Sequence, residues 1–300
     1  MEMTFAVTGA AGRLGSLVLR GLIDQGVDPG RITAITRDAS RAADLAAAGV
    51  QVRTADYGDP ASLRRAFAGV RRAFIVSGHA PPMERAELHR NAFAAARRSA
   101  VESVVYTSFQ GAAADACFSM GRDHHLSERY LRESGLRYAA LRNSFYAETA
   151  HELVDRRGFI PSPSGDGRVA WVSRSDIAET AVQLLLHPGG GNEVLDVSGP
   201  EAPRLSEVAE LLAELSGLEI RYVDESCDDG LRWRREEARR LGLEDWDLES
   251  WMSGNLSMGI GEAGIVSDTV ERITGRAPKS LRELYAAQPE LLDELKDFVS

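Results

Sequence analysis

A glycine-rich loop near the start of the chain constrains the fold more than any other feature. A short apolar run at residues 4–7 leads into Thr8-Gly9-Ala10-Ala11-Gly12-Arg13-Leu14-Gly15, and a helical pattern follows at 14–22. Glycines in this context allow a tight turn, close approach of a ligand to the backbone, and close packing of helix on strand. The helix N-terminus then offers free N–H groups to phosphate oxygens. The loop predicts a dinucleotide site formed by Gly9, Ala10, Gly12, Arg13, Leu14 and Gly15.

Strand and helix patterns alternate along the first half of the chain. Strands are expected at residues 4–7, 32–36, 50–52, 73–76, 103–107 and 136–141, and helices at 14–22, 41–48, 59–68, 83–99 and 123–133. Short, continuously apolar strands separated by helices are typical of a parallel sheet covered on both faces. The pattern predicts an α/β fold, a Rossmann doubly wound parallel sheet, with ligands at the carboxyl ends of its strands.

The alternation weakens after Asn143. We expect a helix at 151–157, a turn-rich loop at 161–167, a strand at 169–172, a helix at 175–186 and a strand at 193–197. From residue 204 onward the patterns are mostly helical, with one strand candidate at 219–223. These features predict a Rossmann domain over residues 1–200 and a smaller, mostly helical substrate-side lobe over 201–300, to which residues 148–166 contribute.

Composition narrows the class of protein. A net charge of −10 argues against a nucleic-acid partner. No apolar run approaches the roughly 20 residues of a membrane span, and no basic leader precedes the first strand, so a cytoplasmic protein is expected. The two cysteines and six histidines show no metal-ligand spacing, so no metal site is expected. The oligomeric state is left open, a homodimer included.

The residue after the second strand indicates which cofactor the loop holds. NAD sites usually carry an acidic residue there for the ribose hydroxyl. This chain has Arg37, whose guanidinium suits a 2′-phosphate, so NADP(H) is predicted. We assign Asp38 to the start of the next helix. Asp56 and Tyr57, after the third strand, are expected near the adenine.

The chain lacks the residue pair of many carbonyl reductases. None of its seven tyrosines is followed by lysine four residues later. That pair lowers the tyrosine pKa for proton transfer to a carbonyl, so simple ketone reduction is not expected. Reduction of a quinone or conjugated dye needs fewer catalytic groups, because the charge of the reduced form is delocalised. The protein then mainly orients the molecule and supplies an apolar surface.

Further motifs follow the glycine loop in order. They are Ala55-Asp56-Tyr57-Gly58-Asp59, Tyr106-Thr107-Ser108, His124-His125-Leu126-Ser127-Glu128, Leu141-Arg142-Asn143-Ser144-Phe145-Tyr146, Gly165-Asp166-Gly167-Arg168 and Ser173-Arg174-Ser175-Asp176-Ile177-Ala178. Through these motifs, residues 4 to 180 resemble the NmrA-like atypical short-chain dehydrogenase/reductase family, in its branch of NADPH:quinone and triphenylmethane-dye reductases. The resemblance implies that Ser77 and Gly78 border the nicotinamide half of the cofactor. It also implies that Ser108, His124 and Asn143 line the cleft, with Ser108 and Asn143 toward the cofactor.

Aromatic residues and histidines supply the candidate substrate contacts. His124 is the candidate proton donor, acting near its ordinary pKa, and Tyr146 is a second catalytic candidate. Because His125 adjoins His124, which imidazole faces the cleft is left open. The candidate substrate contacts are His79, Phe109, His124, Phe145, Tyr146 and Trp171.

Three functions are compatible with these residues. The favoured one is an NADPH-dependent reductase that passes hydride to a quinone-like or other conjugated aromatic substrate. The second is a non-catalytic, NADP-binding redox sensor, since the family resembled includes such proteins. The third is a pathway-specific reductase or isomerase of aromatic specialised metabolism. The histidine, asparagine and aromatic side chains expected in the cleft favour the reductase.

Overall fold

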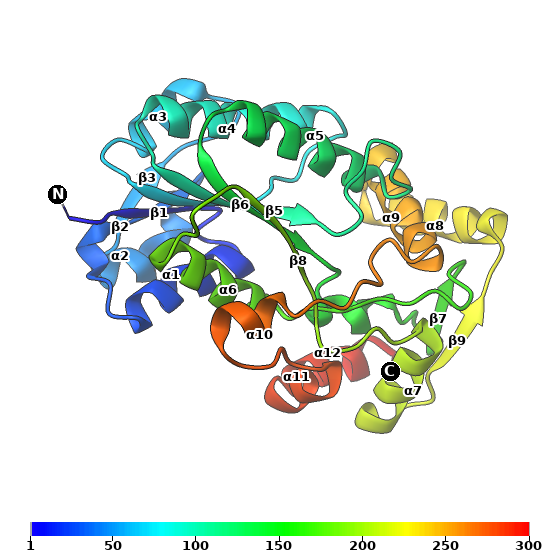
Figure 1. Cartoon of the computed structure of the whole chain (residues 1–300). Helices are drawn as coiled ribbons and strands as arrows, with labels where there is room; N and C mark the ends of the chain where they lie inside the picture. The colour runs from blue at the N-terminus through cyan, green and yellow to red at the C-terminus, as the bar shows by residue number, and fades with distance from the viewer. Residues whose placement is uncertain (1, 300) are drawn as a thin grey trace.

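The computed structural model describes residues 2–299 and contains one seven-stranded sheet. The strand order is β3-β2-β1-β4-β5-β6-β8, and every neighbouring pair is parallel (Figure 1). The predicted doubly wound α/β fold is confirmed. The strands are β1 (Phe5–Thr8), β2 (Ile32–Thr36), β3 (Gln51–Thr54), β4 (Arg72–Ile75), β5 (Ser103–Phe109), β6 (Arg137–Asn143) and β8 (Glu193–Val197).

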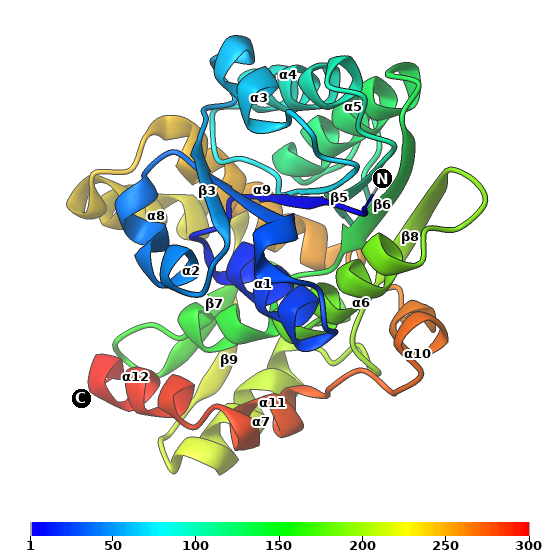
Figure 2. The same ribbon diagram turned by 90° about the vertical axis from the view of Figure 1, so that its left-hand side faces the viewer.

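Helices cover both faces of the sheet (Figure 2). One face packs against α1 (Arg13–Asp24) and α6 (Arg174–Leu186), and the other against α3 (Pro60–Ala66), α4 (Glu84–Arg98) and α5 (Ser119–Glu133), while the short α2 (Ala43–Ala47) precedes β3. Alternation along β1 explains the two cores: Phe5 and Val7 enter the first, and Ala6 the second. Within residues 2–299, no helix has the length and apolar character needed to cross a membrane.

A smaller group of elements lies below the sheet in Figure 1. There β7 (Phe159–Ser162) pairs in parallel with β9 (Arg221–Asp224), against α7 (Leu205–Ser216), while α11 (Leu281–Ala287) and α12 (Glu290–Val299) contact the 3-10 segment Ala147–Leu153. A hairpin of α8 (Cys227–Leu241) and α9 (Asp245–Gly259) stands to one side and reaches α5. The division of the chain at residue 200 stays a prediction.

Two local predictions between residues 147 and 172 are wrong. The expected helix at 151–157 is replaced by the earlier 3-10 segment, because Asp155 Oδ1 accepts from the backbone N–H groups of Arg157 and Phe159 and closes a turn. The expected strand at 169–172 joins no sheet. Its flanks make only isolated bridges, from Val172 to Tyr146 and from Arg168 to Arg204.

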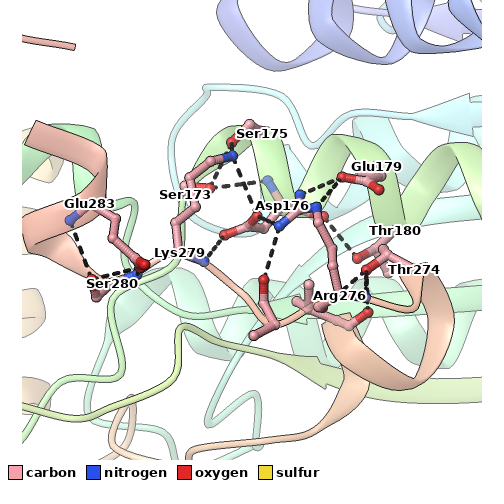
Figure 3. A network of polar contacts seen from close by, with 12 residues as sticks. Ser173, Ser175, Asp176, Glu179, Thr180, Thr274, Arg276, Lys279, Ser280 and Glu283 are labelled. Atoms are coloured by element: carbon pink, nitrogen blue, oxygen red, sulfur yellow. Dashed lines mark hydrogen bonds and ion pairs between the residues drawn. The ribbon is translucent and has the colours of Figure 1, made fainter. Parts of the chain in front are cut away.

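A buried carboxylate attaches the end of the chain to the start of α6. Helix α10 (Thr269–Thr274) lies against α6, and Asp176, which is fully buried, faces the segment that follows (Figure 3). Its Oδ2 accepts from the backbone N–H of Lys279 at 2.9 Å, and its Oδ1 pairs with Arg276 at 2.8 Å. The N-cap of α6, Ser173, accepts from the Asp176 N–H.

Candidate functional site

The glycine loop has the shape that a pyrophosphate requires. Gly9 has a φ of +59°, and its carbonyl accepts from the Gly12 N–H at 2.9 Å. A Cβ at Gly15 would lie 2.3 Å from that carbonyl oxygen, so only glycine lets α1 pack on the turn. A Cβ at Gly12 would meet only the same oxygen within 4 Å, at 3.1 Å, and otherwise open space. The first turn of α1 has no side-chain cap and no acidic residue, so its N–H groups suit a phosphate.

Arg37 and Asp38 separate into two roles after β2. Asp38 accepts from both the N–H and the hydroxyl of Ser40, at 2.9 and 2.7 Å, and caps the 3-10 helix Ala39–Ala42. These hydrogen bonds lower the pKa of Asp38, and its assignment to a helix start is confirmed. Arg37 is exposed and makes no hydrogen bond or ion pair with any residue from 2 to 299. Its role as a phosphate ligand stays a prediction.

Asp56 and Tyr57 both have partners within the fold. Asp56 Oδ1 accepts from the Gly58 N–H at 2.7 Å. The Tyr57 hydroxyl lies 2.6 Å from Thr8 Oγ1 and donates to the Val76 carbonyl at 2.8 Å, and burial raises its pKa. Tyr57 thus connects the ends of β1, β3 and β4 beside the glycine loop, a contact that the sequence does not indicate. The proximity of Asp56 and Tyr57 to an adenine stays a prediction.

The segment after β4 spans from the sheet to α9. The Ser77 N–H donates to Thr107 Oγ1 at 2.7 Å, and the Gly78 N–H donates to His89 Nε2 at 2.8 Å. His79 extends the other way: its Nε2 lies 3.4 Å from Asp247, and its ring centroid lies 4.7 Å from that of Trp246. Ser77, Gly78 and His79 therefore lie along one edge of the region between the sheet and the α8–α9 hairpin.

Ser108 on β5 and Asn143 on β6 lie one position apart in register, since Ser108 pairs with Arg142, and they differ in their contacts. The Ser108 hydroxyl donates to Glu128 at 2.5 Å, and Arg142 donates to both oxygens of that carboxylate, at 2.8 and 2.7 Å. This buried network occupies the Ser108 side chain. Asn143 is 2% exposed, and its Oδ1 has no hydrogen-bond partner among residues 2–299. A buried polar atom without a partner is uncommon, and a bound ligand would satisfy it.

His124 is buried, and its environment differs from the predicted one. Its Nδ1 lies 3.0 Å from the Tyr106 hydroxyl, and its ring is stacked 6.3 Å from that of Phe109. Burial, with a contribution from the positive charge of Arg85, lowers the pKa of His124 well below its ordinary value. The expectation of titration near the ordinary pKa is therefore wrong. His125 is half-buried and has no ring contact or side-chain hydrogen bond within residues 2–299, so His124 is the imidazole beside the aromatic candidates.

Some of the aromatic candidates gather around a cavity of about 450 Å³. Phe145 and Trp171 line it, and Phe109 packs edge-on against Phe145 at 5.0 Å without reaching it. Tyr146 is absent from the lining: it packs under the Arg174 guanidinium, 4.7 Å away, and burial raises its pKa. The other lining residues are Phe118, Met120, Thr149, Glu152, Leu153, Leu241, Leu243, Asp247, Ser250, Trp251, Gly254, Asn255 and Met258.

The far wall of this cavity comes from α9, which sequence reasoning did not assign to the site. Trp251 and Met258 lie on α9, and Phe118 immediately precedes α5. No motif distinguishes these residues from ordinary apolar helix positions. A larger cavity of about 660 Å³ lies between α8 and α9, but its lining includes none of the candidate substrate residues. We place the candidate site at the smaller, aromatic cavity because its lining joins both parts of the protein.

Comparison with known proteins identifies the family. Residues 9–188 match the sequence pattern of a family described as NAD(P)H-binding. Quinone oxidoreductase 2 of Escherichia coli is 31% identical over 284 residues, which cover 93% of this chain and 96% of the relative. The NAD(P)H azoreductase of Xenophilus azovorans is 29% identical, covering 94% and 96%.

Two solved structures with bound cofactor have the same fold. The NADPH complex of the quinone oxidoreductase from Escherichia coli superposes with a TM-score of 0.85 at 30% identity, covering 95% of this chain and 99% of that one. The Citrobacter sp. triphenylmethane reductase with NADP(H) gives 0.83 at 28% identity, covering 95% and 100%. The predicted family and its NADP(H) cofactor are confirmed. The chain belongs to the NAD(P)H-binding family, within its NmrA-like branch of quinone and dye reductases.

Proposed function

We propose that this protein is an NADPH-dependent reductase whose hydride acceptor is a conjugated, quinone-like aromatic molecule. The observation that carries the proposal is the aromatic cavity of about 450 Å³, which Phe145, Trp171 and Trp251 line together. Cavities of this size and character are typical of sites that bury a small aromatic ligand. Relatives named as quinone, azo and triphenylmethane reductases support a conjugated acceptor.

Different residues of the site would bind the cofactor and the substrate. The glycine loop and the N-terminus of α1 hold the pyrophosphate, and Arg37 holds the 2′-phosphate. Asn143 offers its unpartnered Oδ1 to an N–H donor of a bound ligand. When bound, the reduced nicotinamide supplies the hydride. Phe145 and Trp171 orient the acceptor and exclude water from it.

A redox sensor is the alternative, and the cavity argues against it. A protein that only senses the dinucleotide requires no apolar cavity beside it. NmrA, a negative transcriptional regulator with bound NAD, superposes with a TM-score of 0.75 at 15% identity, a likeness of fold alone. The decisive experiment follows NADPH absorbance with simple quinones, with a no-acceptor blank and small aliphatic ketones as controls. Tight NADPH binding without turnover of any quinone or dye would favour the sensor.

The cofactor preference has its own test in Arg37→Ser. The side chain is exposed and unpaired within residues 2–299, so its removal disturbs no internal contact. Hydrogen bonds to charged groups contribute about 1.5–3 kcal/mol, so NADPH affinity should fall by about 10- to 100-fold. NADH affinity should be unchanged. Fluorescence titration measures both, with the exposed Arg41→Ser as the matched control. Equal losses for the two cofactors would contradict the assignment.

The cavity assignment is tested by Phe145→Leu. The substitution removes an aromatic surface, and aromatic pairs contribute about 0.5–1.5 kcal/mol beyond burial, so the KM for a quinone should rise by about three- to tenfold. NADPH affinity should stay within twofold of the unsubstituted protein's, a tolerance of roughly 0.4 kcal/mol. Phe298→Leu, at a position 41% exposed on α12, is the control and should change neither quantity. An unchanged KM in Phe145→Leu would place the substrate elsewhere.

A further inference from the structure

A chain of buried hydrogen bonds runs from the backbone of Gly78 to the ring of His124. The Gly78 N–H lies 2.8 Å from His89 Nε2. His89 Nδ1 lies 2.8 Å from Ser127 Oγ and 3.1 Å from the Tyr106 hydroxyl, which in turn lies 3.0 Å from His124 Nδ1. His89 and Tyr106 are fully buried, and His124 is 5% exposed. These hydrogen bonds therefore link the segment after β4 to α5 through buried side chains.

The position of each proton follows from the two ends of this chain. A backbone N–H can only donate, so His89 Nε2 accepts from Gly78, and the neutral His89 ring carries its proton on Nδ1. Burial lowers the pKa of His89 to about 3, so the ring is neutral at pH 7. The Ser127 hydroxyl donates to the Asp123 carbonyl at 2.7 Å. The Ser127 oxygen is therefore free to accept the proton that His89 Nδ1 donates.

The same reasoning assigns the direction of the hydrogen bond that the Tyr106 hydroxyl makes. It cannot donate to His89 Nδ1, because that nitrogen already carries a proton. Its other neighbours are Ser127, whose oxygen already accepts from His89, and His124 Nδ1 at 3.0 Å. We therefore infer that Tyr106 donates to His124 Nδ1. The neutral His124 ring then carries its proton on Nε2. That nitrogen makes no hydrogen bond to any residue from 2 to 299.

We propose that Tyr106 and His89 are positioning residues that hold His124 as a neutral imidazole with its proton on Nε2, ready to donate a hydrogen bond to the acceptor. The part concerning the acceptor rests on the proposed reductase function. The hydrogen bond would stabilise negative charge as it develops on the acceptor during hydride transfer. His124 does not line the 450 Å³ cavity itself but stacks on Phe109, which packs against Phe145. Its unpartnered Nε2 is not among the fully enclosed polar atoms of residues 2–299, so an acceptor held between the cavity and the cofactor can reach it.

This row of hydrogen bonds from Gly78 to His124 is not a route for protons from solvent. Its far end is the Gly78 amide, which does not release a proton near neutral pH, so His124 donates a hydrogen bond without supplying the proton itself. The charged groups around the ring are Arg85 of α4, which pairs with Asp123 at 3.3 Å, and Arg142 of β6, which pairs with Glu128 of α5. Burial disfavours an imidazolium at His124, and the positive charges of Arg85 and Arg142 add to this effect. We expect the kcat for a quinone to be independent of pH through the ordinary histidine range, about pH 5.5–7.5.

The test is Tyr106→Phe, read by the nitrogen chemical shifts of the imidazole rings. In the unsubstituted protein, His124 should show a protonated Nε2 and His89 a protonated Nδ1, with His124→Gln and His89→Gln used to assign the signals. Tyr106→Phe should give a mixture of both His124 tautomers. Its kcat for a quinone should fall by about fivefold, the typical effect of one neutral hydrogen bond. Tyr138→Phe is the matched control, since Tyr138 is also buried and its hydroxyl has no hydrogen-bond partner within residues 2–299. Tyr138→Phe should change neither the His124 tautomer nor the kcat for a quinone.

The outcomes separate the two proposals. A proton on His124 Nδ1 in the unsubstituted protein, or an unchanged tautomer in Tyr106→Phe, would overturn the positioning role. If Tyr106→Phe does not fold, the shifts of the unsubstituted protein still decide the tautomers. A fixed Nε2 tautomer in a protein that turns over no quinone or dye would support the positioning role and reject the reductase function. A kcat that follows a histidine titration, with the titration lost in His124→Gln, would show that His124 transfers a proton and would overturn the donor role.

Discussion

Gly12→Val is expected to leave a folded protein that binds neither NADPH nor NADH. Gly12 has an ordinary φ of −86°, and among residues 2–299 a Cβ there meets only the Gly9 carbonyl oxygen within 4 Å. At 3.1 Å this contact requires the oxygen to shift by a few tenths of an ångström, which we expect the loop to tolerate. The valine methyl groups would fill the open space that the pyrophosphate needs. Losing two or more charge-assisted hydrogen bonds of about 1.5–3 kcal/mol each should lower affinity by roughly 100-fold or more. Fluorescence titration with both cofactors measures the loss, and circular dichroism confirms the fold.

Two other glycines provide controls for this experiment. Gly15→Val should prevent folding, because its Cβ would lie 2.3 Å from the Gly9 carbonyl oxygen and 2.8 Å from the carbon of that carbonyl. Gly190→Val, with nothing within 4 Å, should leave both folding and cofactor affinity unchanged. Near-normal binding by a folded Gly12→Val protein would show that the pyrophosphate does not lie against this loop.

Asp176→Ala should lower the free energy of unfolding by roughly 3 kcal/mol. The carboxylate is fully buried and accepts from the Lys279 N–H while it pairs with Arg276. Removing one partner of a buried ion pair typically costs about 3–5 kcal/mol. We expect the lower value, because the Arg276 and Lys279 side chains are both 35% exposed and can turn to water. Urea unfolding followed by circular dichroism measures the change.

Glu179 offers a matched control on the same helix. It also pairs with Arg276, but its side chain is 37% exposed. An exposed ion pair contributes about 0–1 kcal/mol, so Glu179→Ala should have little effect. Similar losses in the two variants would mean that burial of Asp176 does not determine its contribution. Loss of the folded state in Asp176→Ala alone would show a contribution larger than we expect.

The Rossmann part of the fold follows from the sequence because its signals are local. Most strands from β1 to β6 contain a short apolar run, and β1 to β5 are each followed by a helical pattern. One of these helices has a clear start signal, Asp59 before Pro60. The apolar pattern at 169–172 predicts a strand wrongly, because Val169 and Val172 are buried by tertiary packing, and burial alone does not imply a partner strand. A backbone turn at Asp155 similarly overrides the helical pattern around it.

The candidate site divides in the same way. The glycine loop can be predicted from the spacing of its glycines, because its function depends on residues adjacent in sequence. The place of Trp251 and Phe118 in the cavity cannot be predicted from the sequence, because they meet Phe145 only when segments far apart in the chain fold together. The roles of Tyr106 and His89 depend on which atom donates to which, and residue type alone does not determine that.

The pairing of β7 with β9 also has a consequence for the order in which the chain matures on the ribosome. Residues 159–162 emerge well before residues 221–224, and β7 has no other partner strand among residues 2–299. Ile160, which is fully buried, belongs to the same core cluster as Leu281 and Leu295 near the end of the chain. A nascent chain can complete β1 to β6 while this segment is still uncovered. The cavity that includes Trp171 therefore forms late in synthesis, once α9 has emerged.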